Sequence, residues 1–128
     1  MTAMVERIEG MAARLETEPH LHRLGALFCE TVLIETEAAS VFVSFRDGRV
    51  ARVTSGPSMK TPWRFALRSD EDALERFWQP LPEPGFHDIF GLVKIGRGRI
   101  EGDILVLVKN LRFFKEFMAL GRLEGERQ

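Results

Sequence analysis

The sequence predicts an α+β fold in which a five-stranded, mainly antiparallel sheet is covered on one face by helices. Apolar residues recur at helical spacing on both sides of a run of four short, alternating segments. Asp47-Gly48 joins two of these segments as a hairpin, and residues 97–101 supply a fifth strand. Consecutive strands joined by a hairpin indicate an antiparallel sheet, so the helices are left to cover one of its faces.

The N-terminal region, residues 1–28, is expected to form two helices. Apolar residues at i, i+4, i+7 and i+11 predict the first helix over about residues 2–16: Met4, Ile8, Met11 and Leu15. Pro19 interrupts this pattern, and a second, short helix follows with Leu21, Leu24 and Phe28 on one face. We expect both helices to pack on the sheet.

Four strands are predicted over residues 31–37, 40–46, 49–54 and 62–68. A two-residue loop at 47–48 pairs Arg46 with Arg49, Phe45 with Val50, and Val43 with Arg52. Two like charges side by side are tolerated only in water, so the Phe45 face is the inner one. The last segment alternates apolar Trp63, Phe65 and Leu67 with Arg64, Ala66 and Arg68, which is typical of a half-buried strand.

The second half of the chain is predicted to be mainly helical. Ser69 and Asp72 have the spacing of a capping box for a helix that Pro80 ends. Three prolines make residues 80–85 a rigid bridge, and helical spacing resumes from Phe86 to Val93. A final helix over residues 104–120 is apolar around most of its circumference, with one narrow polar stripe: Lys109, Arg112 and Glu116.

Length and charge limit the class of protein. A chain of 128 residues with 45% hydrophobic residues is expected to be one domain, residues 1–128, with a single core. A net charge of −1 argues against a protein that binds nucleic acid by neutralising phosphates. One cysteine, no signal peptide and no long apolar run predict a cytoplasmic protein with at most transient membrane contact.

The sequence lacks the motifs of an enzyme, and we expect no catalytic residues, no metal and no cofactor. His20, His22 and His87 do not have the spacing of a zinc site. Gly96 and Gly98 begin a phosphate-loop pattern, but Glu101 stands where the third glycine is required.

Three weaker features have simple structural explanations. Glu35 and Glu37 can form a carboxylate pair, although a solvated strand face is the simpler interpretation. Lys94, Arg97 and Arg99 indicate a solvated strand end, or else a contact with anionic lipid or a ligand carboxylate. Cys29 is expected to be a buried, inert thiol on an apolar helix face.

Two short motifs resemble the lipid-binding domain of the sterol carrier protein-2 (SCP-2-like) family. The first is residues 63–67, Trp-Arg-Phe-Ala-Leu, followed by an acidic helix start. The second is residues 98–103, Gly-Arg-Ile-Glu-Gly-Asp, leading into an apolar helix. Gly102 lets the chain turn, and Asp103 is expected to cap that helix. The resemblance covers about residues 31–120.

This resemblance implies a hydrophobic cavity between sheet and helices that binds a fatty acyl chain, an isoprenoid or another lipid without catalysis. The residues that it places along the cavity are Trp63, Phe65, Phe86, Ile89, Phe90, Val93, Leu105, Val108 and Leu111. The chain ends in Glu126-Arg127-Gln128, which is not a peroxisomal signal, and the proline bridge argues against a sterol as ligand.

Two alternatives remain open. One is an accessory subunit that presents a hydrophobic intermediate to a partner enzyme, a role that the resemblance to SCP-2-like proteins of quinone biosynthesis implies. Its docking surface is expected around Phe113, Phe114 and Phe117. The other is a small hydrolase or isomerase that uses His87 and Asp88.

Overall fold

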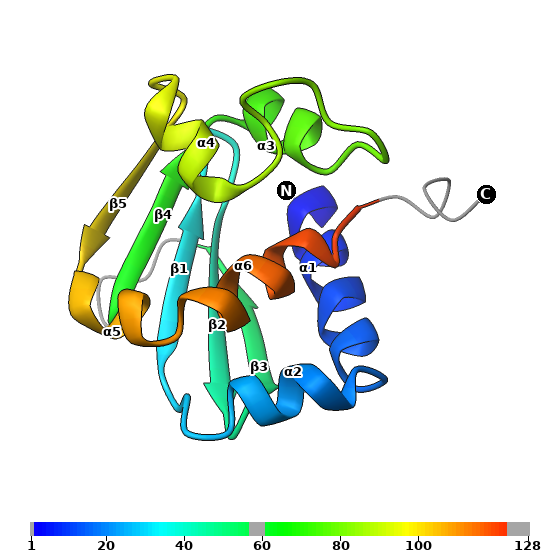
Figure 1. Ribbon diagram of the computed structural model, residues 1–128. Helices are drawn as coiled ribbons and strands as arrows, with labels where there is room; N and C mark the ends of the chain where they lie inside the picture. Colours follow the sequence, from blue (N-terminus) through cyan, green and yellow to red (C-terminus); the bar gives the residue numbers. More distant parts are fainter. Residues whose placement is uncertain (1, 57–60, 123–128) are drawn as a thin grey trace.

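A computed structural model describes residues 2–56 and 61–122 (Figure 1). Eleven elements follow one another along these residues: α1 (Thr2–Leu15), α2 (Pro19–Leu24), β1 (Thr31–Glu35), β2 (Ser40–Arg46), β3 (Arg49–Ser55), β4 (Phe65–Ser69), α3 (Glu71–Phe77), α4 (Ile89–Lys94), β5 (Gly98–Gly102), α5 (Ile104–Lys109) and α6 (Leu111–Ala119). The predicted order of helices and strands is confirmed, except that the final helix is two helices.

The five strands form one sheet in the order β3-β2-β1-β4-β5. All neighbouring strands are antiparallel except β1 and β4, which are parallel. The predicted α+β class with a mainly antiparallel sheet is therefore confirmed. The parallel pair places β4 beside β1 in the centre of the sheet, and β5 forms one edge (Figure 1).

The β2–β3 hairpin turns at Asp47 and Gly48, whose φ angles are +53° and +81°. Arg46 pairs with Arg49 and Phe45 with Val50, as predicted. The next predicted pair is wrong, because Val43 faces Val53 and not Arg52. The register shifts between Ser44 and Phe45, so β3 carries one extra residue in a β-bulge that the hairpin rule does not anticipate.

The fourth strand begins later than predicted, at Phe65, and this changes the position of Trp63. Phe65 and Leu67 are buried among the helices, whereas Trp63 packs with Leu33, Phe42 and Ala66 in a small separate cluster. In a strand, alternate residues share a face, so Leu33, Phe42 and Ala66 lie on the face opposite the helices. We call this the back face. Trp63 therefore does not share a face with Phe65, contrary to prediction.

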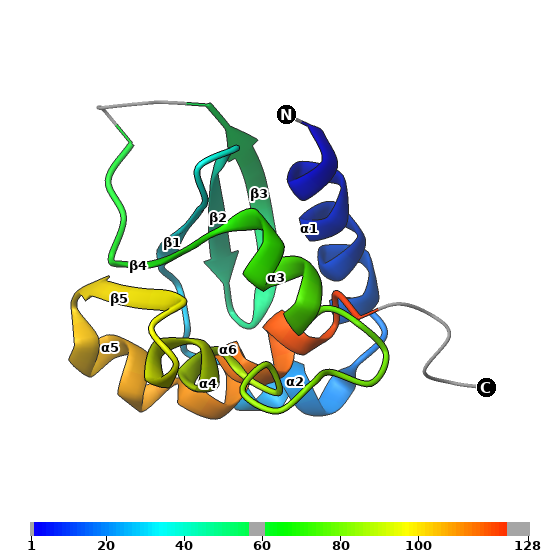
Figure 2. The same ribbon diagram turned by 90° about the horizontal axis from the view of Figure 1, so that it is seen from above.

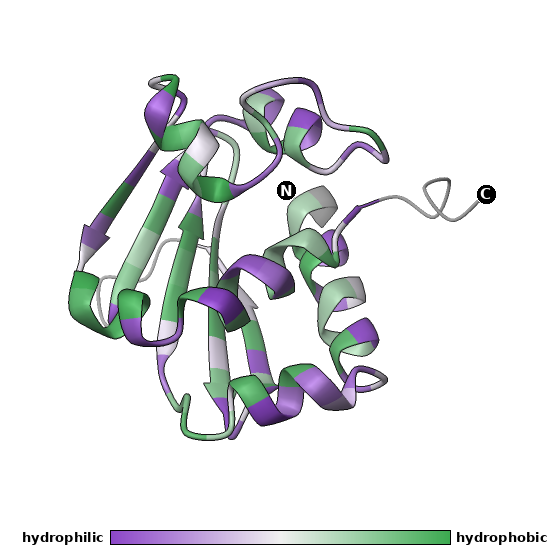
Figure 3. Ribbon diagram, viewed as in Figure 1, coloured by the Kyte–Doolittle hydropathy of each residue, from purple (hydrophilic) through white to green (hydrophobic). Residues whose placement is uncertain are grey.

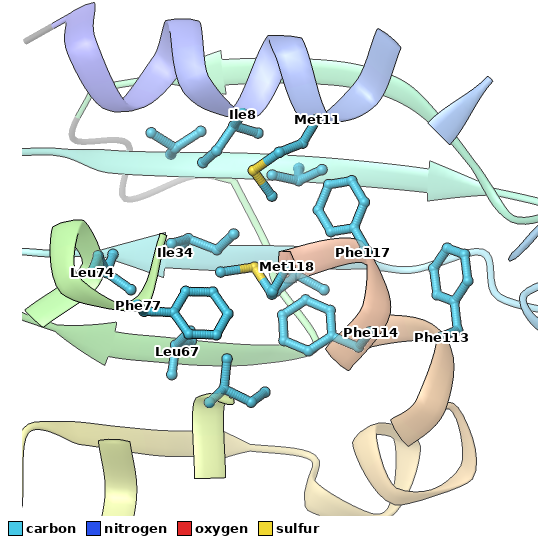
Figure 4. Packing of buried hydrophobic residues seen from close by; sticks show 14 of the residues in the cluster. Ile8, Met11, Ile34, Leu67, Leu74, Phe77, Phe113, Phe114, Phe117 and Met118 are labelled. Carbon is cyan, nitrogen blue, oxygen red and sulfur yellow. The ribbon is translucent and has the colours of Figure 1, made fainter. Parts of the chain in front are cut away.

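Helices cover the other face of the sheet, as predicted. Seen from above, α2, α4, α5 and α6 lie along one side of the strands, and α1 lies beside β3 (Figure 2). Helix α6 places Phe113, Phe114, Phe117 and Met118 against the strands (Figure 4). These side chains belong to one continuous core that also contains Ile8 of α1 and Leu74 of α3.

Acidic side chains cap three helices. Asp88 Oδ1 accepts a hydrogen bond from Gly91 N at 2.9 Å at the start of α4, and Asp103 Oδ1 accepts one from Val106 N at 3.2 Å at the start of α5. The cap of α3 is Asp70 and not the predicted Ser69, because Asp70 Oδ1 accepts from Ala73 N at 2.8 Å. Ser69 remains the last residue of β4 and donates to Arg97 O at 2.6 Å.

The predicted final helix is divided at Asn110. This residue has φ −119° and ψ 25°, which lie outside the helical range, and its side-chain amide donates to Val106 O at 3.0 Å. Beyond this residue α6 has its apolar face in the core, while α5 lies at the ends of β4 and β5 (Figure 1).

Two arginines of α1 hold the end of α6. Arg14 Nη1 donates to Leu120 O at 2.6 Å, and Arg7 Nη1 donates to Gly121 O at 2.7 Å. The indole of Trp78 donates to Met118 O at 2.8 Å. The last carbonyls of a helix have no partner within the helix, so these bonds satisfy them and join the two ends of the described chain.

Asp103→Ala is expected to lower the free energy of unfolding by about 1 kcal/mol, because α5 loses the acceptor for Val106 N. Urea unfolding measures the change. Asp103→Asn is the control, since asparagine is an equally good cap and should restore most of the loss. Equal losses in the two variants would contradict a capping role.

Candidate functional site

The nine residues predicted to line a cavity occupy three different environments. Phe65, Phe86 and Ile89 are buried in the main core, and Leu111 is half-buried against it. Trp63 lies on the back face. The other four are exposed at the surface of α4 and α5: Phe90, Val93, Leu105 and Val108. The structure thus brings three of the nine together in the interior.

Aromatic rings fill the space between α6 and the strands. Phe117 meets Phe45 edge to face with ring centroids 5.0 Å apart. Phe114 meets Phe65 in the same way at 5.2 Å. Phe28 lies 5.1 Å from Phe45. Such pairs stabilise a core beyond the burial of their area, so an apolar ligand that enters here must displace side chains.

Close packing is expected in the free protein, because an empty cavity of ligand size would lower its stability. A void of about 300 Å³ costs on the order of 7 kcal/mol at about 24 cal/mol per Å³. That is comparable with the whole stability of a small domain. A cavity of ligand size in the interior therefore requires either an occupant or helices that open.

The predicted docking patch on α6 is wrong. Phe113, Phe114 and Phe117 have at most 1% of their surface exposed, because the division at Asn110 turns them toward the sheet. The apolar surface lies instead on α4 and α5. Among the described residues, six of nine exposed large hydrophobic side chains fall between Phe90 and Val108.

Helices α4 and α5 are apolar toward the core and toward solvent. On α4, Ile89 and Leu92 are buried, while Phe90 and Val93 are 37% and 38% exposed. On α5, Leu107 is buried, while Leu105 is 63% exposed. Figure 3 shows the hydrophobic colour of α5 around most of its ribbon. An ordinary surface helix has a polar outer face, so these two helices depart from the usual pattern.

The two helices are short and depend on tertiary contacts. Each has six residues, well below the about 12 that an isolated helix needs. Gly91 allows α4 to approach the backbone of Gly85, since a Cβ at Gly91 would lie 2.7 Å from Gly85 O. Asp88 and Asp103 supply the caps described above. The two helices therefore keep their shape only while these contacts to the rest of the fold are made.

The basic cluster at the start of β5 is engaged in ion pairs. Arg97 donates two hydrogen bonds to Asp70, of 2.8 and 2.9 Å, and one to Asp72. Arg99 donates to Glu101 at 2.6 Å. The bonds of Arg97 hold the start of α3 against the start of β5. Of the three basic residues, only Lys94 forms no ion pair with a described residue. The hydrogen bond from Arg97 holds the pKa of Asp70 below its usual value.

This lowered pKa predicts a loss of stability in acid. Ionised Asp70 stabilises the fold above its usual pKa of 3.8, and that stabilisation disappears as the pH falls through the lower folded-state value. Asp70→Asn keeps a capping side chain but removes the charge. We expect the variant to be less stable than the wild type at about pH 6, and the difference to shrink toward about pH 2.5, measured by urea unfolding. A difference that does not change with pH would contradict this role.

Asp88, which the sequence offered as part of a catalytic pair with His87, has structural partners. Asp88 Oδ2 lies 3.5 Å from Lys115 Nζ, in addition to its capping bond. Burial alone raises the pKa of Asp88, but the bond from Gly91 and the charge of Lys115 bring it below its usual value. Both carboxylate oxygens of Asp88 thus have a structural partner, Gly91 N or Lys115 Nζ, and neither partner is His87.

The remaining sequence candidates do not gather into a site. Glu35 contacts Arg68, and Glu37 accepts a hydrogen bond from Glu71 N at 3.0 Å, so the two carboxylates act separately. Cys29 is exposed and not buried as predicted, and its thiol donates to Asp47 at 3.4 Å. The described residues contain no group of three or more potential metal ligands. None of their helices is long and apolar enough to cross a bilayer.

A groove of about 870 Å³, which the sequence analysis missed, lies on the back face. It crosses β1, β2 and β3 and reaches residues 62–64 before β4. Its walls include four arginine or tryptophan side chains and two carboxylates: Arg46, Arg52, Trp63, Arg64, Glu30 and Asp103. The pairing of Arg46 with Arg49 correctly indicated a solvated face at the hairpin. The groove itself depends on the approach of residues 62–64 to β2, which no local pattern shows.

No family model and no curated protein matches the sequence. Solved structures do match the fold. Sterol carrier protein 2 superposes with a TM-score of 0.72 and 10% identity over 91% of this chain and 94% of that one. A UbiJ-SCP2 ubiquinone synthesis protein gives 0.61 and 18% identity over 94% and 95% of the two chains.

A third match is a conserved hypothetical protein of Thermus thermophilus, with a TM-score of 0.68 and 9% identity over 91% of this chain and 85% of that one. Identities this low show a shared fold and not a shared activity. The agreement nevertheless extends over nearly the whole of each chain and confirms the resemblance seen in the two short motifs. The chain has the SCP-2-like fold.

Proposed function

We propose that this protein binds and transfers an apolar small molecule, such as a fatty acyl chain or an isoprenoid, without catalysing a reaction. The observation that carries the proposal is the apolar character of α4 and α5 on both their inner and outer sides. The SCP-2-like fold supports it, because matched structures include a sterol carrier protein.

The proposed path for the ligand runs from the surface of α4 and α5 into the core. Phe90 and Leu105 offer apolar surface outside, and Ile89 and Leu107 continue it inside. A ligand that inserts between these helices and the sheet gains about 0.8 kcal/mol for each methylene removed from water. A chain of ten methylenes thus gains about 8 kcal/mol.

Native mass spectrometry of the purified protein, followed by lipid extraction, tests the proposal. We expect a bound lipid, or micromolar binding of a fluorescent fatty acid. Absence of both would refute the proposed function.

Leu105→Ser tests the path itself. Leu105 is largely exposed, so the fold should remain, but the dissociation constant for a fluorescent fatty acid should rise about tenfold or more, since a buried leucine contributes about 1.5–3 kcal/mol. Leu81→Ser is the matched control, because Leu81 is 88% exposed and lies in the proline bridge. If both variants bind as the wild type does, α5 is not part of the path.

A second function is an accessory subunit that presents a hydrophobic intermediate to a partner enzyme. The match to a ubiquinone synthesis protein favours it, and the exposed side chains of α4 and α5 are the surface that would dock. A tagged chain recovered from its own cells should then bring down one enzyme in stoichiometric amount. A free carrier should bring down none.

A further inference from the structure

The back-face groove has a hydroxyl floor between one cationic wall and one wall in which carboxylates neutralise the arginine. Thr31 and Ser44 pair across β1 and β2, and their hydroxyl oxygens are 3.0 Å apart. On one side stand Arg46 of β2 and Arg52 of β3. On the other side, the segment that leads into β4 contributes Trp63 and Arg64.

The two walls differ in charge. Arg64 is neutralised by Glu30, with Nε and Oε1 2.9 Å apart, and by Asp103 at 3.7 Å. Arg46 and Arg52 form no ion pair with any residue in the described parts of the chain. The carboxylate next to Arg46 belongs to Asp47, and it accepts a hydrogen bond from Cys29. The β2–β3 side of the groove therefore carries two arginines that no described carboxylate binds.

The sheet brings these two arginines together. Arg52 faces Ser44 across the β2–β3 pair, and Arg46 is two residues beyond Ser44 on the same face. Diagonal neighbours of this kind are about 7–8 Å apart at the backbone, within reach of long side chains. An anion between the two guanidinium groups would reduce the repulsion between them.

The guanidinium groups suit one class of anion best. An arginine donates paired hydrogen bonds to the oxygens of a phosphate, and two of them match its charge of about −1.5 to −2 at neutral pH. The hydroxyls of Thr31 and Ser44 bond to each other, which leaves one O–H at the floor free to donate to the anion. The half-buried indole of Trp63 offers an apolar wall to whatever group carries the phosphate.

We propose that the back-face groove binds a phosphate monoester, with the phosphate between Arg46 and Arg52 and its substituent against Trp63. This site lies on the face of the sheet opposite α4, α5 and α6, so it is separate from the proposed lipid path. A molecule bound here leaves the aromatic core undisturbed.

Titration of the full chain with phenyl phosphate, at constant ionic strength, tests the proposal by two-dimensional ¹H–¹⁵N NMR. The indole signal of Trp63 should shift and saturate at about 1 mM or below. The indole signal of Trp78 should not shift, because that group is buried and bonded to Met118 O. No saturable shift of Trp63, or equal shifts of both indoles, would overturn the proposal.

Arg46→Gln and Arg52→Gln, singly and together, test the two charges. Both residues are exposed, so thermal melts should match the wild type, while each substitution should weaken binding about tenfold. Arg23→Gln is the matched control, since Arg23 is an exposed arginine outside the groove. Its dissociation constant should stay within about twofold of the wild type. A loss as large in this control would mean that binding follows overall charge, and the site would be rejected.

Two further titrations distinguish the sources of the phosphate. The source is a lipid headgroup if the protein sediments with phosphatidic acid vesicles and not with phosphatidylcholine vesicles. This sedimentation must require Arg46 and Arg52. Binding of phenyl phosphate without binding to either vesicle identifies a free phosphorylated molecule. Vesicle binding that persists in the double variant counts against the groove as the site.

Discussion

Phe117→Ala is expected to lower the free energy of unfolding by about 3–5 kcal/mol, the usual cost of removing a buried aromatic ring. Phe117 has no exposed surface and lies edge to face with Phe45 at the centre of the core. The end of helix α6 is fixed by the arginines of α1 and by the indole of Trp78, which donates to Met118 O. The surrounding structure can therefore collapse only partly into the space. Chemical denaturation measures the loss.

Phe90→Ala is the matched control for the same residue type. Phe90 is on α4 with 37% of its surface exposed, so its truncation should cost less than about 1 kcal/mol. The two variants should also differ in fatty acid binding. Phe90→Ala should weaken it through the lost apolar surface, whereas Phe117→Ala should keep it per folded molecule. Equal stability losses would show that α4 is packed as firmly as α6.

Gly102→Ala is expected to cost about 3 kcal/mol, from strain and overlap together. Gly102 has φ +101°, a backbone conformation that residues with a Cβ rarely adopt. A Cβ here would lie 2.7 Å from Arg64 O and 2.9 Å from Phe65 Cα, and both are backbone atoms that cannot move aside. The change thus separates β5 from β4 where α5 begins.

Gly56→Ala isolates the strain from the overlap. Gly56 has nearly the same φ, +100°, but a Cβ there would meet no atom of residues 2–56 or 61–122 within 4 Å. Its substitution should therefore cost only the conformational penalty of about 1–2 kcal/mol, visible as a smaller fall in thermal midpoint. If the two alanine variants are equally stable, the β4–β5–α5 junction is less tightly packed than the structure indicates.

Local patterns were enough for most of the elements. The Asp47-Gly48 turn needs only two residues that tolerate positive φ, and the Gly102-Asp103 step needs one turn residue and one cap. Both follow from short-range chemistry, so both predictions are confirmed. The errors in local structure fell where two rules competed: Ser69 and Asp70 are both good caps, and only the pairing of Ser69 with Gly98 across β4 and β5 makes Asp70 the cap.

The candidate site was harder to predict. The sequence identified α4 and α5 as apolar but could not tell which side chains face the core. The sequence of a helix that is apolar all round does not show which side faces the core. Asn110 alone is not a strong enough signal to predict that the helix is divided there. For this reason Phe113, Phe114 and Phe117 were expected at the surface and Leu105 and Val108 in the interior, and the structure has the reverse.

By itself, the sequence determined the class of fold, the hairpin, the joint at Gly102 and Asp103, and the excess of apolar residues near the C-terminus. These depend on φ preferences, capping and hydrophobic period, which act over a few residues. The tertiary structure decided the parallel pairing of β1 with β4, the position of Trp63 on the back face, and the meeting of Arg46 with Arg52 beside it. These depend on contacts between segments far apart in the chain, where register and packing choose among arrangements that local chemistry allows equally.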